Sequence, residues 1–366
     1  MARRPSLQDV LNGLQAEGHL PPDGEARARS AMEVYQRTDV ATPWFVKALA
    51  GFGAWVAAAF LLSFFACVGL WDEEVVVVFL GLILAAGATA MRRASRGVFL
   101  EQLALALCLA GATMMSAGVG MMTNEEVAAA VVQLIVGAVL LVWFPDAILR
   151  FLMALGMAGS TVFLLWKGLG ELGVQLGLLG FAVLAHVLFL DGARWRRGRW
   201  GDLVGPSAYA LACGVMAALL SLCFVGMFGT TLFDHGISTP DALLTLGLTA
   251  LTLYTAWRVM QELGLDATGV AGAAVFVALG LAALMTLHTP AIIAAVGMMV
   301  LAFHRRTPVL LGLAVAFLLA SGGWYYYDLG LTLLAKALAL TGSGLVFLGL
   351  RTFLLRRFPA VAAEVK

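Results

Sequence analysis

The chain has 366 residues, of which 61% are hydrophobic and 12% are charged, whereas soluble domains are about 45–50% apolar and about 25% charged. This composition excludes an ordinary water-soluble enzyme. The 23 Lys and Arg residues balance 22 Asp and Glu residues, which argues against nucleic acid or a strongly acidic ligand as a partner. Long apolar stretches, each able to cross the roughly 30 Å hydrocarbon layer as a helix, predict an integral membrane protein.

The first 42 residues are polar and predict a small cytoplasmic helical hairpin. Ser6 is a candidate N-cap for a helix over 6–18, and turn residues separate this helix from a second one over 25–37. Two short helices bury little surface, so we expect the hairpin to dock on the membrane domain, on a partner or on its twin. Because the segment lacks the apolar core of a signal peptide, the first spanning helix is expected to direct insertion.

Apolar segments fill residues 43–355 and predict an all-α, polytopic bundle of about twelve transmembrane helices, followed by a short cytoplasmic tail over 356–366. Two of the segments are short, and a re-entrant or interfacial helix is the alternative there; they cover 151–166 and 290–304. The predicted spans are 45–70, 75–91, 98–120, 127–144, 151–166, 174–191, 205–227, 242–257, 267–287, 290–304, 308–327 and 330–350.

The charged residues indicate the orientation, because cytoplasmic loops collect Lys and Arg. With the N-terminus inside, all but two of the 23 basic residues fall on the cytoplasmic side. The exceptions are Lys167 in an outer loop and Lys336 within the last span, while the outer loops hold acidic residues such as Glu125 and Glu126. Removing one span from the middle would invert the downstream half and mix the charges, so the pattern favours an even number with both termini cytoplasmic.

Small residues recur at four-residue spacing within several spans, where they let helix backbones approach closely. Ala54 with Ala58 and Gly156 with Ser160 are two such pairs, and they predict packing. Two polar residues lie deeper in spans, Gln133 and His186, and each can form a hydrogen bond across helices. The two halves of the chain show no convincing internal repeat, which weakens a transporter hypothesis.

Lys336 is the first candidate for a ligand or ion site, because an ionisable side chain within a span normally faces protein or water. Helical spacing places Thr332 and Ser343 on the same face as Lys336. The alternative is structural: Lys336 is near enough to the outer end for its long side chain to reach the interface, or it pairs with a neighbour.

Aromatic residues crowd the outer end of the eleventh predicted span. They form a candidate surface for docking an extracytoplasmic partner or a lipid headgroup, although aromatic rings also favour the headgroup layer simply as an anchoring belt. The residues are Trp324, Tyr325, Tyr326, Tyr327 and Asp328.

The densest basic cluster follows the sixth predicted span and is flanked by tryptophans. It suits anionic lipid headgroups, with about 1 kcal/mol for each basic residue near the surface, and stop-transfer anchoring is the alternative. The basic residues are Arg194, Arg196, Arg197 and Arg199.

No residue pattern indicates a metal site or a cofactor. The four cysteines lie in apolar stretches without C-x-x-C spacing, and no two histidines have the spacing of a metal-binding pair. The H-E-x-x-H, G-x-S-x-G, Walker and dinucleotide motifs are absent from the sequence. We therefore expect no metal and no cofactor, and an intramembrane enzyme ranks last among the hypotheses.

Both ends of the apolar region resemble a bacterial inner-membrane family that is known only as a domain of unknown function. The resemblance rests on residues 43–47 (PWFVK) and 51–55 (GFGAW), and on 324–329 (WYYYDL) leading into 333–336 (LLAK). The N-terminal hairpin also looks like the cytoplasmic module that precedes related multi-span proteins. Genes of this family often lie beside one for a membrane-anchored protein with a GDYxxLxY motif, so the resemblance implies a protein partner.

These features lead us to expect a non-enzymatic subunit or scaffold of the inner membrane, which binds a second membrane protein and membrane lipid. Such a protein needs no catalytic residues, and it is compatible with a homo-oligomer. The alternative hypothesis is a transporter or channel for a small solute or lipid, with Lys336 near its outer mouth.

Overall fold

The computed structural model describes residues 44–94, 97–196, 198, 200–228, 242–264, 267, 269–285 and 289–328, together with the single positions 24, 27, 30, 341, 348 and 352. Apart from those single positions, the predicted hairpin over 1–42, the twelfth predicted span and the predicted tail over 356–366 lie outside the described residues. The part of the chain that the structure describes contains helices and turns and no strand. The predicted all-α class is therefore confirmed for these residues.

Each of the first eleven predicted spans coincides with one long helix. Eight of the helices, α3 to α8, α10 and α11, are long and apolar enough to cross a membrane. The helices are α3 (Trp44–Cys67), α4 (Glu74–Ala94), α5 (Val98–Thr123), α6 (Glu126–Trp143), α7 (Ala147–Leu169), α8 (Glu171–Leu190), the short α9 (Gly192–Arg196), α10 (Gly201–Phe228), α11 (Ala242–Glu262), α12 (Val270–Met285), α13 (Pro290–His304) and α14 (Pro308–Asp328).

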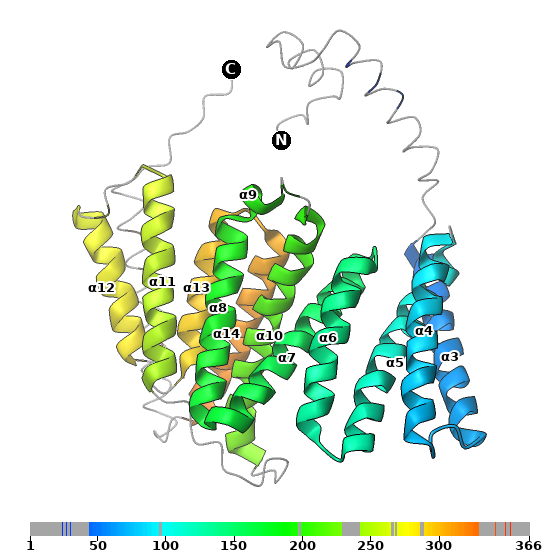
Figure 1. The fold of residues 1–366 in the computed structure, drawn as a ribbon. Coiled ribbons are helices and arrows are strands. Elements are labelled where there is room, and N and C mark those ends of the chain that lie inside the picture. The colour runs from blue at the N-terminus through cyan, green and yellow to red at the C-terminus, as the bar shows by residue number, and fades with distance from the viewer. Residues whose placement is uncertain are drawn as a thin grey trace. The chain divides into compact units, whose positions relative to one another are not determined.

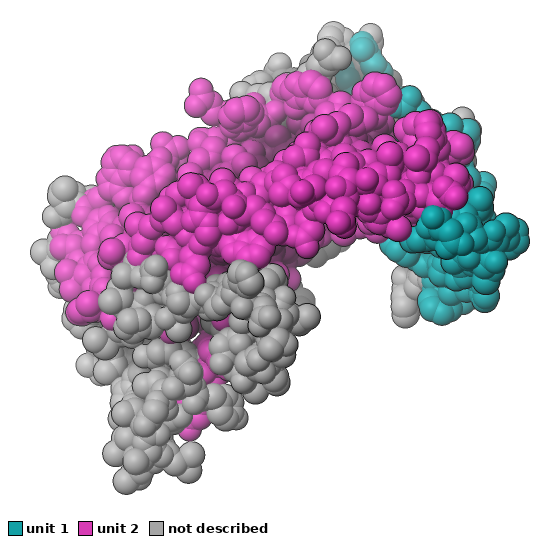
Figure 2. Space-filling model, turned by 60° about the horizontal axis from the view of Figure 1, so that its bottom comes forward, with its two compact units in different colours: residues 1–72, 84–108 teal, residues 73–83, 109–366 magenta. Residues whose placement is uncertain are grey.

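The chain divides into two compact units, which Figure 2 colours separately. The first unit comprises Met1–Asp72 and Leu84–Cys108, and the second comprises Glu73–Ile83 and Leu109–Lys366. The division passes through α4 and α5. Apart from one ion pair, the charged clusters and cavities described below lie within the second unit.

In the first unit, α3 buries the two small side chains Ala54 and Ala58 and exposes several large apolar ones. Ala54 and Ala58 are 0% and 4% exposed, whereas Phe52 and Phe60 are 70% and 72% exposed. The predicted packing face of small residues is therefore confirmed for this helix. An exposed face of large apolar side chains is what a helix beside lipid requires, since lipid tails are as apolar as the side chains.

In the second unit, the buried core is formed mainly by α7, α8, α10, α11, α13 and α14. The chain runs up and down through these helices, and the short α9 joins the end of α8 to the start of α10 (Figure 1). We call the end where α7, α10 and α14 begin the arginine end, because Arg150, Arg194, Arg258 and Arg305 lie there. The opposite end, where α6 and α8 begin with Glu126 and Glu171, is called the acidic end.

The two short predicted spans are both helices, and one of them extends beyond the predicted apolar segment. Asp146 caps α7: its Oδ1 accepts hydrogen bonds from the backbone N–H groups of Ile148 at 2.8 Å and Leu149 at 3.1 Å. The short predicted span 151–166 is thereby part of a 23-residue helix. The other short span, 290–304, is a 15-residue helix that starts with a proline at its first turn.

Candidate functional site

The three residues proposed as a ligand or ion site, Thr332, Lys336 and Ser343, lie outside the described residues. The aromatic cluster occupies the last turn of α14, where the side chains of Trp324 and Tyr326 are partly buried. The side chains of Tyr325, Tyr327 and Asp328 are not described. Both sites therefore stay predictions.

The basic cluster lies at the arginine end, in and after α9. Arg194 is exposed, and so are the flanking Trp195 and Trp200. Arg196 ends α9, with its side chain not described, while Arg197 and Arg199 lie outside the described residues. The structure thus places the visible part of this cluster on the connection between α8 and α10.

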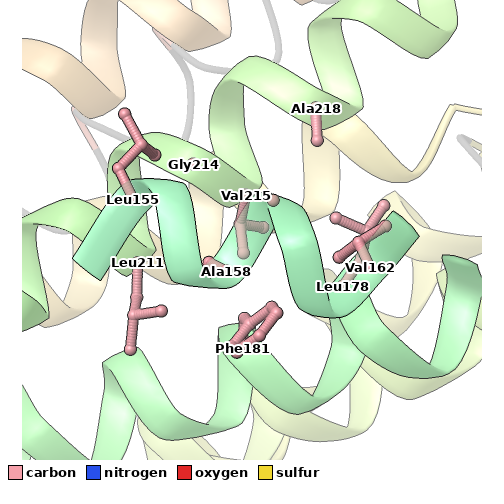
Figure 3. A pocket seen from close by; sticks show the side chains of 10 residues that line it. Leu155, Ala158, Val162, Leu178, Phe181, Leu211, Gly214, Val215 and Ala218 are labelled. Atoms are coloured by element: carbon pink, nitrogen blue, oxygen red, sulfur yellow. The ribbon is translucent and has the colours of Figure 1, made fainter. Parts of the chain in front are cut away.

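A cavity of about 270 Å³ lies between α7, α8 and α10. Side chains from all three helices converge on it, with Phe181 of α8 reaching toward α7 (Figure 3). It sits near the midpoint of each helix, and its lining includes no polar side chain. The lining residues are Leu155, Ala158, Gly159, Val162, Leu178, Phe181, Leu211, Gly214, Val215 and Ala218.

The cavity has the properties of a site for an apolar ligand. A cavity of about 150 Å³ with similar walls stays dry and binds benzene, and this one is larger. Gly159 lines the cavity and is exposed, so the space is reachable from the outer surface of the bundle. A Cβ atom added at Gly159 would meet no other atom within 4 Å. This cavity was not predicted from the sequence, because it depends on how the side chains of three helices pack against one another.

The interface between α11 and α13 contains a buried polar contact. The Thr252 hydroxyl donates to the carbonyl of Leu248 at 2.9 Å within α11 and lies 3.4 Å from the carbonyl of Ile293 in α13. A Cβ atom added at Gly297 would lie 2.6 Å from the Thr252 Oγ1 atom. Gly297 therefore makes room for the buried threonine, and the two helices are in close contact there.

Gln133 in α6 forms a hydrogen bond to a neighbouring helix, as its position within a predicted span led us to expect. Its Oε1 atom accepts from the hydroxyl of Ser116 in α5 at 2.9 Å. Its Nε2 atom lies 2.9 Å from the position of a Cβ added at Gly156 in α7. The small residue of α7 thus accommodates the amide, and Gln133 links three consecutive helices.

His186 is buried in α8, with 3% of its surface exposed. Its Nδ1 atom lies 2.8 Å from the carbonyl oxygen of Ala182, one turn earlier in the same helix. Its Nε2 atom has no hydrogen-bond partner among the described residues. The contact that the structure shows is therefore local to α8 and does not join two helices.

A network of charges holds the arginine end of α8, α11 and α13 together. Glu262 accepts from His304 Nε2 at 2.8 Å and from Arg305 Nη2 at 3.0 Å. Arg305 also donates to the carbonyl of Leu190 at 2.6 Å, and Arg258 reaches Asp191 at 3.4 Å. Sequence reasoning missed this network. The only local signal is the four-residue spacing of Arg258 and Glu262, which are themselves 3.9 Å apart.

The acidic end carries one ion pair between α6 and α7. Lys167 Nζ lies 2.8 Å from the Glu126 carboxylate and 5.4 and 5.3 Å from the ring centroids of Phe163 and Trp166. The charge distribution predicted that Lys167 and Glu126 lie on the same side, which this contact confirms. A depression beside the pair, of about 560 Å³, is lined in part by the exposed Glu125.

The described residues contain no group of three or more His, Cys, Asp and Glu side chains placed to hold a metal ion. Within the same part of the chain, Cys67, Cys108 and Cys213 are free thiols. The geometry of the described residues thus includes an apolar cavity, closely packed helices and several ion pairs, among them Arg92 with Glu101 at 3.2 Å.

Comparison with known proteins gives a family but no activity. No curated protein and no solved structure matches the chain significantly. Residues 43–357 match the family described as Domain of unknown function (DUF4401). This range covers the whole membrane region predicted from the sequence, and it confirms the resemblance to a domain of unknown function. The chain belongs to the DUF4401 family.

Proposed function

We propose that the protein is a non-enzymatic, multi-pass protein of the bacterial inner membrane that holds a membrane lipid between α7, α8 and α10 and serves as a subunit or scaffold for a second membrane protein. The single observation that carries the proposal is the cavity of about 270 Å³, all of whose lining side chains are apolar. It lies within helices that are long and apolar enough to cross a membrane.

Energetics favour an occupied cavity. Its walls are apolar and it opens at the exposed Gly159, so contact with an apolar chain is favoured over contact with water, by about 25 cal/mol for each Å² of apolar surface covered. The nearest apolar material around a transmembrane helix is the acyl chain of a lipid. Such a chain can enter at the exposed Gly159, where the wall has no side chain.

The charges support an orientation for the bundle. The arginine end carries Arg150, Arg194, Arg258 and Arg305, and cytoplasmic surfaces collect basic residues. We therefore assign this end to the cytoplasm. The acidic end, with Lys167 and Glu126, then faces outward.

The partner site in this proposal is the aromatic cluster. Because α14 begins at the arginine end, its last turn with Trp324 and Tyr326 lies toward the outer surface in this orientation. Partly buried aromatic side chains at that level suit an extracytoplasmic partner. The transporter hypothesis depends on Lys336, which is outside the described residues, and it stays a prediction.

Filling the cavity tests the proposal. Gly159→Leu adds a side chain where no atom lies within 4 Å, and Ala218→Leu narrows the cavity from α10. The matched control is Gly180→Leu, because Gly180 is an exposed helical glycine of α8 that also has no atom within 4 Å and does not line the cavity. Each protein is purified gently from native membranes and examined by native mass spectrometry.

We expect the unmodified protein and Gly180→Leu to retain one lipid per chain, together with a second polypeptide. Gly159→Leu and Ala218→Leu should lose the lipid while keeping their helical circular dichroism spectrum. Retention of the lipid by both cavity variants would overturn the lipid site. A preparation without a second polypeptide would overturn the subunit role.

A further inference from the structure

We infer that the lipid in the cavity is an anionic phospholipid of the leaflet at the arginine end, whose phosphate binds Arg150. The inference rests on the proposed function and names the ligand of the same cavity. It follows from three observations: the depth of the cavity, the free donors of Arg150 and the difference in charge between the two ends of α7.

The depth of the cavity fits an acyl chain whose headgroup lies at the membrane surface. Leu155 and Val162 line the cavity five and twelve residues after Arg150 on α7, which is about 8 and 18 Å along a helix. Half of a hydrocarbon layer is about 15 Å. A chain whose headgroup contacts Arg150 therefore ends within the cavity.

The depth of the cavity alone does not show from which membrane leaflet the lipid comes. Lys167, at the other end of α7, lies five residues beyond Val162, so it is as close to the cavity as Arg150 is. Charge makes the selection. Lys167 is paired with Glu126 at 2.8 Å, and the exposed Glu125 lies beside the same depression. These carboxylates repel an anionic headgroup. At the arginine end, the Asp146 carboxylate accepts from backbone N–H groups of α7, and those of Asp191 and Glu262 pair with Arg258, His304 and Arg305. The exposed side chains there include Asp202 as well as Arg194 and Trp195.

At the arginine end, the guanidinium group of Arg150 has hydrogen-bond donors for a phosphate. Its Nη1 atom makes one long hydrogen bond, 3.5 Å from the carbonyl oxygen of Asp202 in α10. Its Nε atom is buried and has no hydrogen-bond partner among the described residues. The Nε atoms of Arg258 and Arg305 likewise have no partner among the described residues, but the Nη2 atoms of these two arginines are engaged by the carboxylates of Asp191 and Glu262.

A guanidinium with unused donors suits a phosphate, because its planar fork binds two phosphate oxygens at once. Arg150 also stands on α7, the helix that supplies four of the residues lining the cavity. The start of α10, which packs against it, supplies the Asp202 carbonyl and follows the basic segment containing Arg194. A single anionic phospholipid thus satisfies Arg150 with its phosphate and fills the apolar cavity with one chain.

The test is a competition between two lipids with the same chains. The full-length protein is incubated with an equimolar mixture of phosphatidylglycerol and phosphatidylethanolamine, and native mass spectrometry measures which lipid is retained. Arg150→Gln removes the proposed phosphate contact. Arg306→Gln is the control, because Arg306 is exposed at the same end of the bundle, and its loss changes the net charge equally.

We expect the unmodified protein and Arg306→Gln to prefer phosphatidylglycerol about fivefold or more, as one basic contact with an anionic lipid provides. Arg150→Gln should lose this preference while its total lipid occupancy stays the same. Equal retention of both lipids by the unmodified protein, or an unchanged preference in Arg150→Gln, overturns the inference. The lipid site itself fails only if Gly159→Leu and Ala218→Leu retain their lipid, so the two failures are distinguishable.

Discussion

The α11–α13 interface and the α7–α8–α10 cluster are both built from apolar helices, but they differ in how the space beside a glycine is used. At the first, the hydroxyl of Thr252 occupies the space that Gly297 leaves free. At the second, a Cβ atom added at Gly214 would lie 2.9 Å from Leu155 Cδ1, whereas one added at the exposed Gly159 would meet no atom within 4 Å, and both glycines line a cavity of about 270 Å³. Gly297 therefore serves close packing, whereas Gly159 serves access to the cavity.

The difference shows how a membrane bundle separates stability from binding. Helices within a bilayer gain little from the hydrophobic effect, so close packing and hydrogen bonds hold them together. The α11–α13 interface has both, and the network around Glu262 reinforces its arginine end. The α7–α8–α10 cluster also has close contacts, such as that between Gly214 and Leu155, but it leaves a cavity with apolar side chains, which we propose holds a lipid chain.

The largest effect should follow from breaking the closely packed region. In Gly297→Leu, the new Cβ atom lies 2.6 Å from the Thr252 hydroxyl and must displace it from the carbonyls of Leu248 and Ile293. We expect a loss of about 3 kcal/mol in the free energy of unfolding, the upper range for overpacking. Titration with sodium dodecyl sulfate, followed by circular dichroism, measures it.

The control for this substitution is Gly312→Leu in α14, since Gly312 is exposed and a Cβ added there meets no atom within 4 Å. Its free energy of unfolding should equal that of the unmodified protein. Equal stability of Gly297→Leu and Gly312→Leu would show that the α11–α13 interface is not closely packed.

A smaller effect should follow from removing the charge at the end of the same interface. Glu262→Gln keeps the shape of the side chain but removes the carboxylate that His304 and Arg305 share. These side chains are partly exposed, so we expect a loss of about 1 kcal/mol in the free energy of unfolding. The loss should shrink in 1 M salt, where charges are screened. A loss that is independent of salt would mean that the network stabilises by packing alone.

The smallest effect concerns the ion pair at the acidic end of α7. Lys167→Met keeps the apolar stem against Phe163 and Trp166 but removes the contact with Glu126. For a solvent-exposed pair we expect a loss of about 0.3 kcal/mol in the free energy of unfolding. The same detergent titration measures it, with Lys167→Arg as the charge-retaining control. A loss above about 1 kcal/mol would place this contact among the main supports of the bundle.

Most of the fold could be predicted from hydropathy, because a membrane span is a local property of the sequence. The differences between the predicted spans and the observed helices lie at the helix ends. The predicted tenth span, 290–304, matches α13, whereas α11 continues past residue 257 to Glu262. An apolar window ends where charged residues begin, but the helix continues because Arg258 and Glu262 find partners on neighbouring elements.

The candidate site was less predictable, because its features depend on contacts between distant segments. Gln133 and Lys167 were recognisable as exceptional residues, and the structure supplies their partners, Ser116 and Glu126. The role that we propose for Arg150 was not recognisable, since the hydrogen bonding of its guanidinium depends on its position against α10. The cavity has no signature in the sequence at all, because apolar residues line it just as they line a filled core.

The most direct test of a lipid site between α7, α8 and α10 is an electron microscopy structure of the protein in nanodiscs that contain phosphatidylglycerol. We predict continuous density for an acyl chain between Ala158, Phe181 and Val215, leading to a phosphate at Arg150. Density showing the three helices packed together, with side chains filling the space beside Gly159, would contradict it.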